Sequence, residues 1–122
     1  MKDIFKDVLG TDGVHGLLFI SDEGEVKLSK FSDQFKDEEE KLSRIDWASF
    51  TIELTGINDA ELLYENARFY VKKSGTGYLI VILGYEAPIS MVRLNCEIML
   101  PALDKMKSTG KKIGALFRKK IF

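Results

Sequence analysis

The sequence has little cysteine and no long apolar run. Cys96 is the only cysteine, so no disulfide can form within the chain, and a lone thiol is typical of a reducing compartment. No apolar run approaches the ~18–20 residues that span a bilayer. The first ten residues, MKDIFKDVLG, contain two aspartates and no apolar core, so we expect no signal peptide. These absences predict a cytoplasmic protein without a membrane span.

Residues suited to catalysis or metal binding are also scarce. His15 is the only histidine, and no second histidine or cysteine is spaced to complete a metal site with it. No serine lies in a nucleophile motif, and the acids of the DEEE run at 37–40 lack the spacing of a calcium loop. Cys96 falls in the apolar seam of an expected helix, where it is a small buried hydrophobe. The sequence therefore predicts no catalytic residue, no metal, no cofactor and no enzymatic activity.

The glycine-rich stretch GTDGVHG at 10–16 raises one alternative, a phosphate-binding loop. Such a loop runs from strand to glycines to helix, whereas here the expected helix precedes the glycines and turns its negative end toward them. No Gly-Lys-Ser/Thr follows either. We therefore assign structural roles to four glycines: a left-handed helix end at Gly10, a turn at Gly13, close approach to a central strand at Gly16 and a hairpin turn at Gly24.

Charge is divided unevenly along the 122 residues, although the net charge is only −1. Residues 1–104 hold eleven Lys and Arg against all nineteen Asp and Glu, a net −8, and residues 105–122 hold seven Lys and Arg and no acid, a net +7. An acidic body argues against nucleic acid as the main partner. The basic end is either a solvated terminus or a segment that binds an acidic surface: an anionic membrane, an acidic partner or the protein's own body. We expect one domain over residues 1–106 and a basic tail over 107–122.

Apolar periodicity predicts three helices and five strands in this domain. The expected helices cover 2–9, 42–55 and the stretch from Pro88 to about 106, and the expected strands cover 14–21, 25–31, 61–65, 68–73 and 78–84. Pro101 should bend the last helix or begin a new segment. Because short turns join the strands, the order α-β-β-α-β-β-β-α predicts an α/β (α+β) fold with a five-stranded antiparallel sheet and flanking helices.

The expected helix over 42–55 is apolar on more than one face. One stripe contains Leu42, Ile45, Ala48 and Ile52, and a second contains Trp47, Phe50 and Leu54. A helix of this kind must contact more than its own sheet. Trp47 is then either a core residue or an anchor at an interface, where aromatic residues are enriched.

Two segments resemble the Roadblock / dynein light chain (Roadblock/LC7) family. GVHGLLFISDEGEV (13–26) is similar to the family's first hairpin, and YLIVILGYEAPISMVRLNCEIMLPAL (78–103) is similar to its closing strand and last helix. The resemblance covers about residues 1–106. It implies a profilin- or longin-like fold and a homo- or heterodimer formed by the middle strands and the central helices. The interface residues expected on this basis are Ile45, Trp47, Ala48, Ile52, Leu63 and Glu65.

The resemblance also implies a kind of function. Members of the family regulate or scaffold small Ras-like GTPases, some of them as GTPase-activating proteins, or act as light-chain adaptors of motor complexes. The family has no catalytic motif to carry over, so no catalytic residue is transferred. The expected function is that of a dimeric, non-catalytic GTPase regulator or scaffold. The alternatives are a motor-complex adaptor and a ligand-sensing profilin-like domain.

Overall fold

The computed structural model describes residues 4–65 and 67–108, which are built around one five-stranded sheet. The strands are β1 (Val14–Ser21), β2 (Val26–Phe31), β3 (Asp59–Leu63), β4 (Arg68–Lys73) and β5 (Gly77–Leu83). They lie in the order β2-β1-β5-β4-β3, and every neighbouring pair is antiparallel. The predicted five-stranded antiparallel sheet is confirmed. β3 covers Asp59–Leu63 rather than the expected 61–65, so both of its ends lie two residues earlier. Glu65 therefore lies after the strand.

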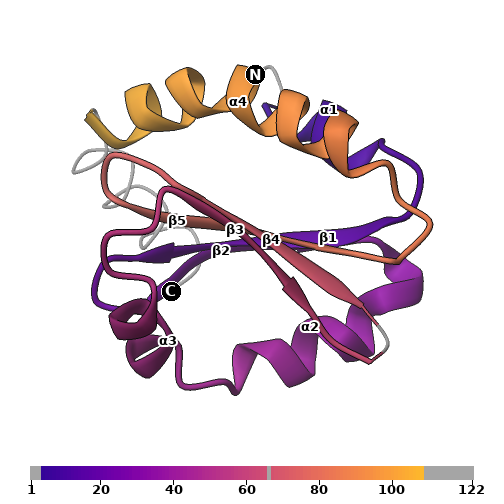
Figure 1. Cartoon of the computed structure of the whole chain (residues 1–122), viewed down its shortest axis with the longest axis horizontal. Coiled ribbons are helices and arrows are strands. Elements are labelled where there is room, and N and C mark those ends of the chain that lie inside the picture. The colour runs from indigo at the N-terminus through magenta and orange to yellow at the C-terminus, as the bar shows by residue number, and fades with distance from the viewer. Residues whose placement is uncertain (1–3, 66, 109–122) are drawn as a thin grey trace, which may run out of the picture.

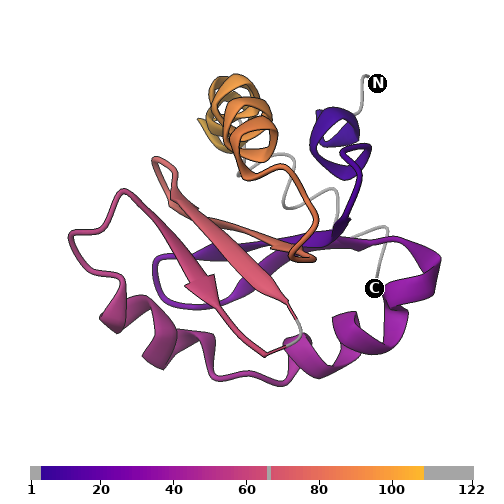
Figure 2. The same ribbon diagram turned by 45° about the vertical axis from the view of Figure 1, so that its right-hand side comes forward.

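Helices cover both faces of this sheet (Figures 1 and 2). One face carries α1 (Lys6–Leu9) and α4 (Ile89–Ser108), and the other carries η1 (Asp33–Phe35), α2 (Lys36–Ser43) and α3 (Trp47–Glu53). β1 and β5 lie at the centre of the sheet and are apolar on both faces, as the near-continuous hydrophobic runs predict. Alternate residues serve the two cores: Leu17, Phe19, Leu79 and Val81 on the α4 side, and Leu18, Ile20, Ile80 and Ile82 on the α2–α3 side.

The single helix expected over 42–55 is wrong, because the chain divides at 44–46 into α2 and α3. Asp46 caps the start of α3: its carboxylate accepts hydrogen bonds from the Ser49 N–H at 3.2 Å and the Ser49 hydroxyl at 2.7 Å. These bonds lower the pKa of the Asp46 carboxyl. An aspartate cap satisfies N–H groups that have no partner within the helix, so it favours a new start over continuation of α2.

The last helix follows the prediction more closely. Its expected seam is Val92, Cys96, Met99, Leu103 and Met106. The first four are buried against the sheet, and the side chain of Met106 lies outside the described part of the structure. α4 continues through Pro101 to Ser108, so Pro101 does not begin a new segment. The predicted boundary between the domain and the basic tail, between residues 106 and 107, falls inside the last turn of α4. The tail from residue 109 onward lies outside the described residues.

The glycines differ in what their backbone requires. Gly10 ends α1 with φ −81°, so the predicted left-handed conformation there is wrong. Gly13 and Gly24 have φ of +88° and +87°, a region that side chains disfavour. A Cβ on Gly24 would also lie 2.3 Å from the backbone nitrogen of Ala48, so the β1–β2 hairpin tip presses on the start of α3. A Cβ on Gly16 would lie 2.3 Å from the Phe31 ring.

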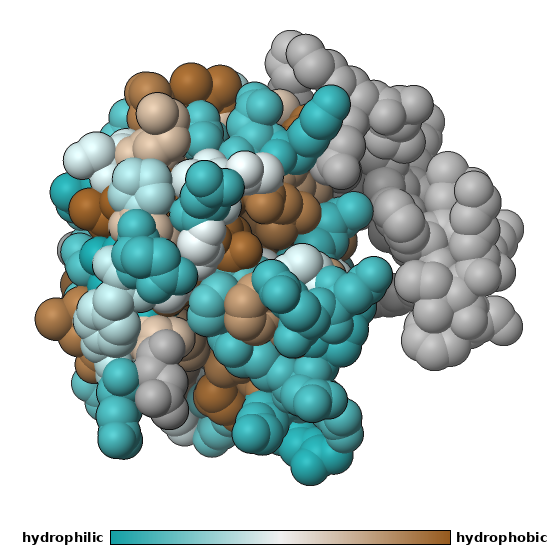
Figure 3. Space-filling view, turned by 90° about the vertical axis from the view of Figure 1, so that its right-hand side faces the viewer, coloured by the Kyte–Doolittle hydropathy of each residue, from teal (hydrophilic) through white to brown (hydrophobic). Residues whose placement is uncertain are grey.

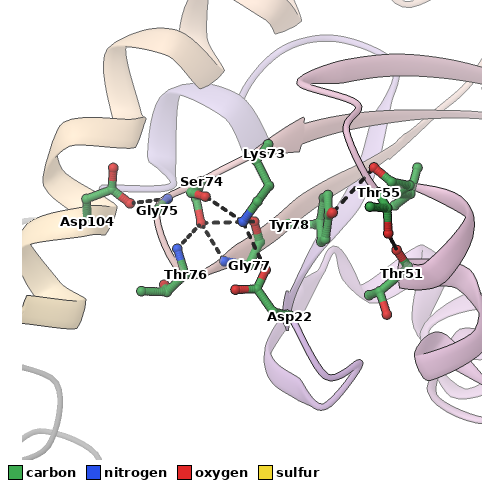
Figure 4. A network of polar contacts seen from close by, with 11 residues as sticks. Asp22, Thr51, Thr55, Lys73, Ser74, Gly75, Thr76, Gly77, Tyr78 and Asp104 are labelled. Atoms are coloured by element: carbon green, nitrogen blue, oxygen red, sulfur yellow. Dashed lines mark hydrogen bonds and ion pairs between the residues drawn. The ribbon is translucent and has the colours of Figure 1, made fainter.

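A network of polar contacts joins the β4–β5 turn to the rest of the domain (Figure 4). The Lys73 ammonium pairs with Asp22 of the β1–β2 hairpin at 2.9 Å and donates to the Ser74 carbonyl at 2.9 Å. The Ser74 hydroxyl accepts from the Gly77 N–H at 3.1 Å, and the Gly75 N–H donates to Asp104 of α4 at 3.1 Å. The turn is thereby tied both to the first hairpin and to the second half of α4.

Candidate functional site

The two edges of the sheet differ in how readily another strand can pair with them. Edge strands are commonly protected by lysines and bulges. β2 has both: it carries Lys27 and Lys30, and its register against β1 shifts between Phe19 and Ile20. β3 has neither, because it pairs with β4 over five consecutive residues without a shift. β3 is therefore the edge better suited to accept a further strand.

The acids on β3 are neutralised from within the domain. Asp59 pairs with Arg93 of α4 at 3.1 Å, and Glu61 pairs with Arg68 of β4 at 3.2 Å. The Arg68 side chain is only 11 % exposed and also donates to the carbonyls of Gly84 and Ala87, at 3.1 and 2.6 Å. Arg68 thus links the β5–α4 loop to Glu61 on the β3 edge. It also neutralises the Glu61 carboxylate, whose charge would repel a second acidic strand.

Exposed apolar side chains occur on β3, directly after it and on the helix that precedes it in the chain. Ile52, on the helix before β3, is 73 % exposed, and Leu63, at the end of β3, is 66 % exposed. Ile45 and Tyr64 are also exposed. Single exposed apolar residues are normal, but several of them beside an open sheet edge are typical of a protein interface.

The structure separates the six residues expected at the interface into two groups. Ile45, Ala48, Ile52, Leu63 and Glu65 are exposed. Trp47 instead lies in the core, 2 % exposed, where its indole N–H donates to the Leu42 carbonyl at 3.0 Å and its ring meets the edge of Phe50. The prediction of Trp47 as an interface anchor is therefore wrong for this chain, because its whole side chain is used to seat α3 on the sheet.

Two features of the domain were not predicted from the sequence. The pairing of Glu61 with Arg68 depends on strand register, which a single sequence does not display. A second apolar stripe on α4, formed by Met91, Leu94 and Ile98, could have been found from its spacing of three and four residues. The helix predicted there had one buried seam, and this stripe was not predicted.

A hollow of about 420 Å³ opens where α2 meets the end of the β3–β4 hairpin. Its lining consists of Glu38, Lys41, Leu42, Tyr64, Glu65, Ala67 and Phe69. Its lining combines apolar and aromatic side chains with three charged ones, Glu38, Lys41 and Glu65. Because Tyr64 and Glu65 belong to both, the hollow is continuous with the end of the β3 edge.

The groups that most resemble catalytic residues have structural surroundings. The His15 ring stacks on Phe35 with centroids 3.8 Å apart, and its Nδ1 lies 3.1 Å from a Glu38 carboxylate oxygen. Burial raises the pKa of the Cys96 thiol to about 12, which leaves it protonated and unreactive. Within residues 4–65 and 67–108, no three His, Cys, Asp or Glu side chains are grouped so that they could hold a metal ion. No helix in these same ranges is both long and apolar enough to cross a membrane.

Comparison with known proteins identifies the fold. No protein-family model matches the sequence, and no curated protein is significantly similar to it. Solved structures are similar. The Roadblock/LC7 domain from Streptomyces avermitilis superposes with a TM-score of 0.69 at 10 % identity, over 86 % of this chain and 95 % of that one. Myxococcus xanthus MglB gives 0.63 at 14 % identity, over 87 % and 89 %. An MglB structure with a tetrameric arrangement gives 0.60 at 18 % identity, over 84 % of each chain. The chain therefore has the fold of Roadblock/LC7 domains.

Proposed function

We propose, starting from its Roadblock/LC7 fold, that this protein is a dimeric, non-catalytic regulator or scaffold of a small Ras-like GTPase in the cytoplasm. The observation that carries the proposal is the β3 edge, which is regular, charge-neutralised and flanked by exposed apolar groups. The resemblance of residues 13–26 and 78–103 to the Roadblock family supports it. The nucleotide of this system is then bound by the GTPase, and the chain acts through its surface. Nucleic acid is not an expected partner.

The proposed dimer joins two β3 strands about a two-fold axis. Antiparallel pairing of the same strand extends the two sheets into one and satisfies the backbone groups of the open edge. Leu63, at the end of β3, and Ile52, on the preceding helix α3, are exposed apolar groups that such a dimer would cover. The tetrameric arrangement of one similar structure indicates that this fold can assemble. A heterodimer with a second Roadblock-like chain would use the same surface.

The dimer is tested by placing a charge at Ile52, one of its expected interface residues. Ile52→Asp is expected to convert a dimer of about twice 13.8 kDa into a monomer, because a buried unpaired carboxylate is costly at an interface. Light scattering and circular dichroism measure mass and fold together. The matched control is Ile98→Asp on α4, where the isoleucine is 63 % exposed against 73 % for Ile52, and it should leave the mass unchanged. A wild-type chain that is monomeric at micromolar concentration would contradict the proposed dimer.

The GTPase role is tested with small Ras-like GTPases encoded in the same genome. The wild-type chain is expected either to accelerate GTP hydrolysis by at least about tenfold or to form a stable complex, as judged by phosphate release and size-exclusion chromatography. Ile52→Asp should weaken the effect if the dimer is the active form. The proposal fails if no such GTPase shows acceleration or complex formation.

A further inference from the structure

β3 directs the backbone groups of every second residue toward the open edge of the sheet. The Tyr64 N–H, one residue beyond the strand, donates to the Ala67 carbonyl at 2.9 Å and so points toward the β4 side. In an antiparallel pair this direction alternates from residue to residue. The N–H and C=O groups of Asp59, Glu61 and Leu63 therefore point away from β4, where a further strand can bind them. Figure 3 shows hydrophobic side chains among hydrophilic ones on its left side, the side on which Figure 2 places β3.

These outward groups restrict how a second copy of β3 can pair with the first. A two-fold axis that passes between the two Glu61 residues pairs all three positions: Glu61 meets Glu61, and each Asp59 meets a Leu63. A register shifted by two residues pairs only two of the three, because only alternate residues have outward backbone groups. The register centred on Glu61 therefore satisfies the most backbone groups of the open edge.

The centred register brings two carboxylates together. Directly opposite residues of a hydrogen-bonded antiparallel pair have Cα atoms about 5.5 Å apart and side chains on the same face, and like charges there destabilise the pairing. In this domain each Glu61 carboxylate is already paired with Arg68 at 3.2 Å. The carbonyls of Gly84 and Ala87 accept from the same guanidinium and hold it in place. Two neutral pairs, rather than two bare carboxylates, would therefore meet at the axis.

The internal pair also favours a second copy over a different chain. A partner strand with a basic residue opposite Glu61 would itself neutralise the carboxylate, and Arg68 would then leave an excess positive charge. A strand with an acid at the same position requires the arginine, and β3 is such a strand. The charges of this edge therefore match those of its own copy.

We infer that the β3 edge binds a second copy of this chain in the register that places Glu61 at the two-fold axis, and that Arg68 is the residue that permits this self-pairing. The inference rests on the proposed dimer and deepens it, since it selects a homodimer. Asp59, the other acid on the outer side of β3, lies about 14 Å from its counterpart in this register. That distance exceeds the screening length at 0.1 M salt, about 10 Å, so its partner Arg93 is not required for pairing.

The register is tested by disulfide cross-linking of the full chain. Glu61→Cys places two thiols opposite each other at a Cα separation that a disulfide spans, so mild oxidation is expected to give a covalent dimer. Leu63→Cys is the matched control, because its two thiols lie about 14 Å apart in the same register and should not cross-link. The native Cys96 is buried and does not compete. Efficient cross-linking of Leu63→Cys, or none of Glu61→Cys, would overturn the register.

The role of Arg68 is tested by Arg68→Met, with the dimer measured by analytical ultracentrifugation. The dimer Kd is expected to rise at least about tenfold at low salt, and added salt should reverse part of the loss by screening the carboxylates. Adding Glu61→Gln to Arg68→Met should restore the dimer, which a purely structural role of Arg68 would not allow. The matched control is Arg93→Met, which should change the Kd by less than about threefold.

Circular dichroism verifies that each variant folds, and the cross-linking result decides the inference if Arg68→Met does not. Three further results would overturn it: a dimer that Arg68→Met leaves intact, a loss that Glu61→Gln does not reverse, or equal weakening by Arg93→Met. All three are obtained with a wild-type chain that dimerises, so they leave the proposed function in place. A wild-type chain that is monomeric by itself would instead contradict the proposed dimer, and the inference with it.

Discussion

Trp47→Ala is expected to destabilise the domain by about 3–5 kcal/mol, the range found when large aromatic residues are removed from cores. Trp47 is 2 % exposed, belongs to the core on the α2–α3 side, and meets Phe50 edge-on with centroids 5.1 Å apart. Its indole N–H also donates to the Leu42 carbonyl, which ties the start of α3 to the end of α2. Removing it leaves a cavity and loses that link. The free energy of unfolding is measured by urea denaturation followed by circular dichroism.

Two comparisons keep this expectation testable. Ile52→Ala, on the solvent side of the same helix, should change the unfolding free energy of the monomer by less than about 0.5 kcal/mol. Trp47→Phe keeps most of the volume and should cost clearly less than the alanine.

Because Trp47 is the only tryptophan, its fluorescence reports its own burial: emission should stay blue-shifted when Ile52→Asp dissociates the dimer. A red shift on dissociation would contradict the core assignment and restore Trp47 as an interface residue.

Gly77→Ala is the second substitution with a large expected effect, a loss of about 2–3 kcal/mol. Gly77 pairs with Ser21 at the start of β5, and a Cβ there would lie 2.1 Å from the carbonyl oxygen of Ile20. That neighbour is backbone in the centre of the sheet, so the clash cannot be relieved by a side-chain rotation. The β1–β5 ladder must separate locally instead. The loss is measured as a shift in the urea midpoint at constant slope.

The matched control lies two residues away in the same turn. At Gly75 the nearest atom to an added Cβ is an Asp104 carboxylate oxygen at 3.4 Å, which is ordinary contact. Gly75→Ala should therefore be within about 0.5 kcal/mol of the wild type. If both alanines cost the same, the cause is the loss of glycine from the turn rather than the approach of β1.

Much of the fold could be read from local pattern. The continuous apolar run of β1 predicted a central strand, and the turn residues between the later strands predicted antiparallel neighbours. The division of the helix at 44–46 was missed although its signal is present, since Asp46 followed by Ser49 is a helix start. The apolar stripes over 42–54 favoured one long helix. The hydrogen bonds of the Asp46 cap favour a new helix start, and in the structure the helix divides there.

The candidate interface was predictable only in part. Ile52 and Leu63 could be nominated as apolar groups on the central helix and a middle strand, and both are exposed in the structure. The choice between β3 and β2 as the open edge depends on the bulge in β2 and on the pairing of Asp59 and Glu61 with arginines from α4 and β4. Arg93 is thirty-four residues from Asp59, and Arg68 is seven residues from Glu61. No helix or strand periodicity in the sequence therefore connects these pairs.

The sequence by itself determined the order of elements, the antiparallel sheet and the charge asymmetry between body and tail, because alternation, turn chemistry and composition are properties of neighbouring residues. Only the tertiary structure decided what each apolar group meets. It buried Trp47, left Ile52 and the Met91–Leu94–Ile98 stripe in solvent, and brought Gly77 against the Ile20 carbonyl. The physical reason is that hydrophobicity favours burial without specifying a partner. The partner is selected by packing and register between segments far apart in the chain.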